Sequence, residues 1–181
     1  MPNPPTQPGE ILVRAHTVGQ LFQPLDPSPL EEKDLDAKVE DYIVSWAQEL
    51  PTKASLSITL RLSEAALAEP QVASLERAFQ AYFAGRADRL RAELRELFRE
   101  GRRSLVVGLP VLTVSLLISQ LVTQLAGPGT LTYLVGESLL ILGWVANWRP
   151  LEIFLYAWWP IRRRLHLYRR LAVARVQVRS E

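Results

Sequence analysis

Two long apolar runs dominate the second half of the chain. They cover Ser104–Ala126 and Thr130–Trp148, and only Gly127-Pro128-Gly129 separates them. Each run is close to the roughly 20 residues that a helix needs to cross the hydrocarbon core of a bilayer. The short glycine–proline segment leaves room only for a tight turn. The pattern therefore predicts a helical hairpin that crosses a membrane twice.

Arginines flank this hairpin on its outer ends and are absent from its turn. Because positively charged residues near membrane spans favour the cytoplasmic side, we expect both termini in the cytoplasm. Arginine-rich, lysine-poor usage points to a bacterial source, so the expected location is the inner (cytoplasmic) membrane, with a multi-pass topology. We expect contact with anionic lipid headgroups. The residues expected at that interface are Arg102, Arg103, Arg149, Trp158, Arg162, Arg163 and Arg164.

The first half of the chain alternates between strand-like and helix-like patterns. Glu10–His16 and Ser55–Leu62 have the period of half-buried strands, most clearly where Leu56, Ile58, Leu60 and Leu62 alternate with polar residues. Asp34–Leu50 carries apolar residues at helical spacing, and a second helix begins near Pro70. This order predicts a small α+β domain, similar to half of a ferredoxin-type sandwich.

The second of these helices has no strong breaker before the first apolar run, so we expect one long helix from the domain to the membrane. After the hairpin, Leu151–Trp159 is amphipathic and is expected to lie on the inner membrane surface. A basic helix, Ile161–Leu171, should follow. The end of the chain alternates Val176 and Val178 with polar residues, which predicts a third strand that could return to the sheet.

These patterns divide the chain into four parts. Residues 1–9 form a proline-rich tail that we expect to be disordered, and residues 10–103 form the cytosolic α+β domain. Residues 104–148 form the hairpin, with spans at 104–126 and 130–148. Residues 149–181 hold the interfacial helix, the basic helix and the C-terminal strand.

Composition adds three constraints. The chain contains no cysteine, which excludes disulfides, thiolate nucleophiles and iron–sulfur clusters. The net charge is only +2, and the basic excess is confined to the segment after the second span. Arginines beside a membrane exit favour topology and lipid contact over RNA or DNA binding, and no nucleic-acid recognition module is visible. The N-terminus lacks the charged and apolar regions of a signal peptide.

Three stretches resemble a family of small bacterial inner-membrane proteins. They are GWVANWRPLEIFLYAWWPIRRRLHLYRRL (Gly143–Leu171), LDPSPLEEKDLD (Leu25–Asp36) and GRRSL (Gly101–Leu105). The family shares a W-R-P-L-E run followed by a tyrosine and paired tryptophans, usually with an acidic residue after the tyrosine, where this chain has Ala157. The resemblance implies the two-span topology and carries no assigned activity.

A polar set within the hairpin is the candidate site. Glu137 lies in the second run at a depth close to that of Gln120 in the first, and Ser119 and Gln124 extend the polar stripe. A carboxyl group in hydrocarbon is costly, so it must pair, become protonated or face water. Glu137 either bonds across helices or subunits and holds an oligomer together, or it lines the path of an oligomeric channel or transporter.

No motif points to catalysis or to a bound cofactor. The acidic loop at Leu25–Asp36 lacks the glycine and ligand spacing of an EF-hand, and His16 and His166 have no metal-binding spacing. We therefore expect no metal, no cofactor and no enzyme activity. The leading hypothesis is a homo-oligomeric membrane protein whose cytosolic domain binds a protein partner or organises an assembly. The alternatives are a small channel or transporter subunit, and an accessory subunit of a larger membrane complex.

Overall fold

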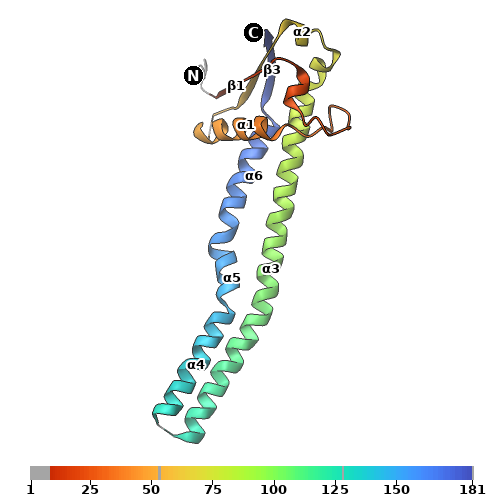
Figure 1. Cartoon of the computed structure of the whole chain (residues 1–181). Coiled ribbons are helices and arrows are strands. Elements are labelled where there is room, and N and C mark those ends of the chain that lie inside the picture. The colour runs from red at the N-terminus through yellow and green to blue at the C-terminus, as the bar shows by residue number, and fades with distance from the viewer. Residues whose placement is uncertain (1–8, 53, 128, 181) are drawn as a thin grey trace. The chain divides into compact units, whose positions relative to one another are not determined.

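A computed structural model describes residues 9–52, 54–127 and 129–180, and the chain divides into two compact units (Figure 1). Unit 1 comprises residues 1–90 and 163–181, and unit 2 comprises residues 91–162. The tail predicted to be disordered lies outside the described residues except for Gly9, and so does Pro128 in the predicted turn. The mixture of helix and strand expected from the sequence is confirmed.

Unit 1 contains a small sheet with helices between its strands. The strands are β1 (Glu10–Ala15), β2 (Ser57–Leu62) and β3 (Arg175–Ser180). The helical elements are η1 (Val18–Leu21), α1 (Ala37–Glu49), α2 (Glu64–Leu67), η2 (Pro70–Ser74), the first part of α3 (Leu75–Ala126) and most of α6 (Trp158–Ala172). The two predicted strands and the long unbroken helix are confirmed within a few residues.

The sheet has the order β1-β2-β3, and both strand pairs are parallel. The predicted return of the C-terminal strand to the sheet is therefore confirmed. The comparison with half of a ferredoxin-type sandwich is wrong, because that arrangement separates its parallel strands, whereas β1 and β2 are direct neighbours here. Parallel neighbours need a crossover connection, which α1 supplies between β1 and β2.

One face of the sheet forms the core of unit 1. Ile11, Ile58 and Leu60 from the strands are buried to within about one per cent, and Phe79 and Phe83 of α3 are fully buried. Aromatic rings in this core meet edge to face or at a tilt, which is the arrangement that ring quadrupoles favour. The alternation read from the β2 sequence is thus the alternation between this core face and the opposite face.

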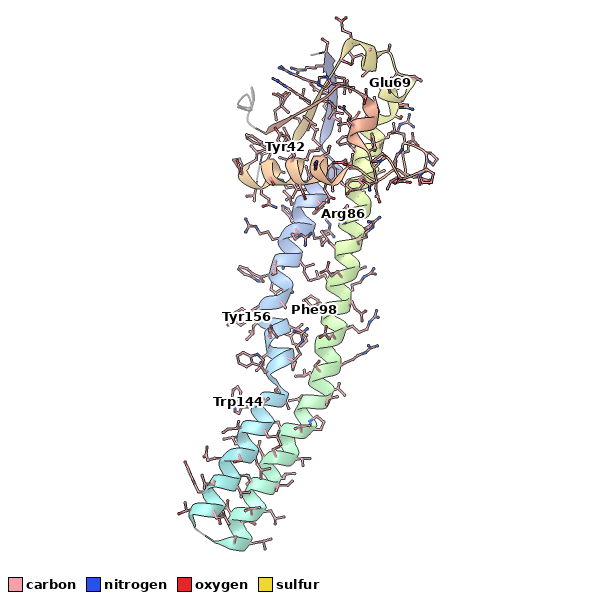
Figure 2. All side chains as sticks on the ribbon, viewed as in Figure 1. Tyr42, Glu69, Arg86, Phe98, Trp144 and Tyr156 are labelled. Atoms are coloured by element: carbon pink, nitrogen blue, oxygen red, sulfur yellow. The ribbon has the colours of Figure 1, made fainter. Side chains whose placement is uncertain are left out.

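A buried carboxylate holds the three main helices of unit 1 together. Glu40 of α1 is 8% exposed and accepts hydrogen bonds from the Tyr82 hydroxyl of α3 at 2.6 Å and the Tyr168 hydroxyl of α6 at 2.7 Å. Its other partner is Arg86 of α3, whose Nε and Nη2 lie 2.8 Å from the same carboxylate oxygen. Figure 2 shows Arg86 between α3 and α6. We call Glu40, Tyr82, Arg86 and Tyr168 the Glu40 cluster.

Burial acts to raise the pKa of Glu40, but the hydrogen bonds from Tyr168, Tyr82 and Arg86 outweigh it, so the pKa is lowered from its usual 4.5. A carboxyl group with a lowered pKa in the folded state stabilises that state at neutral pH. This contribution is lost as the pH falls through the folded-state pKa, below the usual value.

Replacing Glu40 tests this stabilisation. We expect Glu40→Gln to lower the stability of unit 1 by about 1–3 kcal/mol at pH 7, because a charged acceptor of three donors is replaced by a neutral amide. The loss should shrink as the pH approaches the region where Glu40 itself is protonated. Thermal unfolding of the full chain in detergent, followed from neutral pH to about pH 3, measures both effects. Asp41→Asn, at the exposed neighbouring position, is the control and should change little.

Unit 2 consists of helical segments that pack lengthwise. They are the second part of α3, α4 (Thr130–Ala146), α5 (Trp148–Glu152), the π-helix η3 (Ile153–Ala157) and the start of α6. Within this unit, α3 and α4 lie side by side in Figure 1 and share the hydrogen bonds described below. By length and composition α3 can cross a membrane, whereas α4 is apolar but has only 17 residues. The second crossing stays a prediction.

The expectation of a separate helix over Leu151–Trp159 needs a correction. The structure has an almost continuous helical run from α5 through η3 into α6, and this run packs on α3 instead of standing apart. Ile153 is fully buried with its Cγ2 atom against Gly101, and the rings of Phe154 and Phe98 stack at 6.1 Å. Sequence periodicity identified the apolar face, but not the helix that covers part of it. Contact of the remaining exposed side chains with lipid stays a prediction.

Candidate functional site

Small residues let α3 and α4 approach closely. A Cβ atom added at Gly108 would lie 2.7 Å from Asn147 Oδ1 and 2.9 Å from the backbone oxygen of Ala146. A Cβ atom at Gly143 would lie 2.6 Å from Leu112 Cδ1 and 3.1 Å from its Cα. Neither position can hold a larger side chain without moving the helices apart. Gly108 and Gly143 therefore allow the close approach of α3 and α4 within one chain.

Asn147, at the C-terminal end of α4, links the two helices. Its buried side-chain amide donates hydrogen bonds to the carbonyl oxygens of Gly108 on α3 and Gly143 on α4, both at 2.9 Å. Buried amides must find such partners, because an unpaired donor in an apolar environment costs free energy. No sequence pattern singled out Asn147, since a polar residue at the end of an apolar run looks like a boundary residue.

The predicted polar set does not come together in one chain. Ser119 lies at the α3–α4 interface, and its hydroxyl is 3.5 Å from the Gly136 carbonyl oxygen. Glu137, Gln120 and Gln124 are exposed on the outside of the hairpin. Within the described residues, none of these three side chains makes a hydrogen bond or ion pair. The predicted depth match between Glu137 and Gln120 thus produces no contact inside the chain.

These polar groups sit in a broad apolar surface. Only 11% of the most apolar window of α3 is buried, and the outward side chains of α4 are similarly uncovered. Large side chains that are at least half exposed on the hairpin include Val106, Val107, Val114, Leu117, Leu121, Leu125, Leu131, Tyr133, Leu134, Ile141, Leu142, Trp144 and Val145. A continuous apolar surface of this kind marks contact with a membrane or with other protein.

The arginines expected at the headgroups have three kinds of environment. Arg149 forms ion pairs with Glu100 at 2.8 Å and Glu152 at 3.1 Å, and the hydrogen bond that Arg149 donates to Glu100 is the main cause of its raised pKa. Its charge is therefore matched within the chain. Arg162 lies over the Trp158 ring at 5.4 Å, a cation–π contact. The remaining four, Arg102, Arg103, Arg163 and Arg164, are exposed.

An open groove lies next to these residues in unit 2. It is lined by Leu94 and Phe98 of α3, Phe154 of η3, and Trp158 and Arg162 of α6. Figure 2 shows Phe98 pointing toward the η3 segment and Tyr156 pointing away from α3. Phe154 lies in the π-helical turn and stacks on Phe98. Such turns occur frequently at functional sites. Trp158 closes the turn by donating from Nε1 to the Phe154 carbonyl oxygen at 2.9 Å.

The acidic loop has a structural role. The Asp26 carboxylate accepts hydrogen bonds from the backbone N–H groups of Ser28 and Asp34, both at 2.9 Å. The side-chain hydrogen bond from Ser28 and these backbone bonds lower the pKa of Asp26 to about 2. No group of three or more metal-ligating side chains occurs in the described residues.

Comparison with known proteins does not assign the chain to a family. No protein-family model matches the chain, and no curated protein or solved structure gives a significant match. The resemblance stated from the W-R-P-L-E run stays a prediction.

Substitution of Gly108 tests the α3–α4 interface. Gly108→Ala should separate the helices and break the Asn147 hydrogen bond to the Gly108 carbonyl, because the new Cβ would meet backbone atoms of α4. We expect a loss of about 1–3 kcal/mol, the usual cost of overpacking. Thermal unfolding of the full chain in detergent is the measurement.

Gly85→Ala is the matched control on the same helix. A Cβ atom there meets nothing within 4 Å. Alanine is the better helix former by about 1 kcal/mol, so this variant should be as stable as the natural chain or more stable. Equal destabilisation by the two alanines would contradict the close-packed interface.

Proposed function

We propose that the chain is a non-enzymatic, homo-oligomeric membrane protein with two spans, whose soluble α+β unit binds a protein partner or organises an assembly. Its place is the bacterial inner membrane, with both termini in the cytoplasm. The spans anchor the protein and the copies meet through the outer surface of the hairpin. Lipid headgroups contact the exposed arginines at the ends of the spans.

A single observation carries the oligomer: Glu137 is exposed in an apolar surface and has no partner among the described residues. Tyr133, Ile141 and Trp144, which lie within two turns of it on α4, are exposed too. A carboxyl group in hydrocarbon costs several kcal/mol unless it is paired, protonated or wet. The amides of Gln120 and Gln124, also exposed, are suitable partners when they belong to another copy.

The second candidate function is an oligomeric channel or transporter in which Glu137 lines the path. The α3–α4 interface is closed by Gly108, Gly143 and Asn147, so one hairpin encloses no aqueous path. A channel or transporter therefore requires several copies around an axis lined by Glu137. The outward position of this carboxyl group is consistent with that arrangement as well, and the next experiment separates the two.

Substitution of Glu137 tests the oligomer. Glu137→Gln keeps the size and the hydrogen-bonding capacity, so the oligomer should survive. Glu137→Leu removes both and should weaken it by roughly 1–2 kcal/mol per contact, which is a shift of about tenfold in the dissociation constant. Native mass spectrometry in detergent over a range of concentrations measures this.

The same two variants distinguish a role of Glu137 in holding the oligomer together from a role in transport. If Glu137 lines a path, both substitutions should abolish pH- or cation-dependent flux in liposomes while assembly persists. Glu137→Leu that alters neither assembly nor flux would contradict both roles. Ser138→Leu, at the neighbouring exposed position, is the control for added apolar bulk.

The topology is tested separately with single cysteines, since the natural chain has none. A membrane-impermeant maleimide applied to intact cells should label Gly129→Cys in the turn. It should label Arg175→Cys in β3 only after the cells are permeabilised. Labelling of Arg175→Cys from outside would overturn the proposed orientation.

A further inference from the structure

The sheet of unit 1 has a second face that differs sharply from the core face. In a strand, alternate side chains point to opposite faces, and in this parallel sheet the residues in register share a face. Three rows therefore cross the second face from β1 to β3. They are Glu10–Ser57–Arg175, Leu12–Thr59–Gln177 and Arg14–Arg61–Arg179. We call the last row the arginine row.

Within the described residues, no helix of unit 1 is placed over this face. The strand order β1-β2-β3 means that both parallel connections step in the same direction, and crossovers of the usual right hand then lie on one face. Exposure agrees with this for the arginines: Arg14, Arg175 and Arg179 are exposed and Arg61 on the central strand is half-buried. Glu10 and Thr59 on the same face are buried and hydrogen-bonded to each other. Parallel sheets are almost always covered on both faces. An uncovered face on such a sheet is a position for a third layer.

The charge of the arginine row indicates what that layer contains. Like charges directly opposite each other on neighbouring strands are destabilising. Within the described residues, none of the three arginines has an acidic partner, and Arg179 only donates to Gln177 at 3.1 Å. The nearest acid on the face, Glu10, is 8% exposed and already accepts from the Thr59 hydroxyl at 2.6 Å. Three adjacent guanidinium groups thus lack a matching anion.

We propose that this face binds an acidic helix of a partner protein, which completes a third layer over the sheet. Strands lie about 4.8 Å apart, so the arginine row extends over roughly 10 Å, which matches about two turns of a helix that crosses the three strands. Carboxylates spaced one turn apart on the helix pair with the arginines, which prefer such planar, two-oxygen partners. An apolar side chain on the same helix packs on Leu12, and a polar one bonds Gln177.

The composition of the face favours a helix over a nucleic acid. No aromatic residue stands in any of the three rows, so bases would have no side chain on which to stack. This inference rests on the proposed function in one respect, that the soluble unit is the part that binds a partner.

The test uses the full chain in detergent micelles and a synthetic helical peptide of about 16 residues, long enough to cross all three strands. The peptide carries glutamates at i, i+4 and i+8 on one face, a leucine beside them and a fluorophore. A scrambled peptide of identical composition is the first control. Fluorescence anisotropy should show binding of the patterned peptide that weakens with salt, and weaker binding of the scrambled one.

Arg61→Gln is the decisive variant, and Arg169→Gln is its matched control. Both remove one positive charge from unit 1, and Arg169 is exposed on α6, outside the sheet. Arg61→Gln should weaken peptide binding about tenfold, the effect of losing one charged hydrogen-bonded pair, and Arg169→Gln should leave it unchanged. Because Arg61 is repelled by its neighbours, Arg61→Gln should also leave the melting temperature equal or higher.

Three results would overturn the proposal. They are equal binding of the two peptides, equal effects of the two glutamine variants, and a lower melting temperature of Arg61→Gln that accounts for its lost binding. Competition by an RNA oligonucleotide or by phosphatidylglycerol micelles at concentrations below that of the peptide would assign the face to another anion instead. The oligomer measured with the Glu137 variants does not involve this face, so either proposal can fail alone.

Discussion

The carboxylate of Glu40 is the interaction on which unit 1 depends. Its two oxygens accept from Tyr82, Arg86 and Tyr168, which ties α1 to α3 and to α6, and α6 is separated from α1 by most of the chain. Burying a carboxylate is expensive unless every lone pair is matched, and here the three donors supply that match. Tyr168 comes from the segment that follows the hairpin, so the small domain is complete only after the apolar runs have been made and α6 has returned to it.

The same requirement, that polar and charged groups find partners, applies to the rest of the molecule. At the α3–α4 interface, glycine brings two backbones together and the Asn147 amide satisfies both of them. In contrast, Glu137 on the outer surface of the hairpin and the three arginines on the second face of the sheet have no partner of opposite charge among the residues that the structure describes. Polar groups that have partners stabilise the fold of the single chain. We propose that the polar groups without partners mark where other molecules bind.

Periodicity in the sequence was sufficient for most of the local structure. The alternation in β2, the helical spacing of α1 and the lack of a breaker after Gly85 led to elements that the structure contains. Packing between distant segments was not predicted in the same way. Ile153 and Phe154 pack on α3, a contact that the periodicity of residues 151–159 does not reveal. The likeness to a ferredoxin half was wrong, because no local pattern specifies which strands become neighbours.

For the candidate site, the sequence by itself determined that the apolar runs exist, that Glu137 lies within one of them and that arginines flank them. These properties depend on residue type and spacing alone. Only the tertiary structure decided which side of the hairpin each residue occupies. It placed Gly143 and Ser119 inward and Glu137 outward, and it brought Arg14, Arg61 and Arg179 into one row from three distant segments. Register and facing follow from the close approach of backbones, which sequence periodicity does not encode.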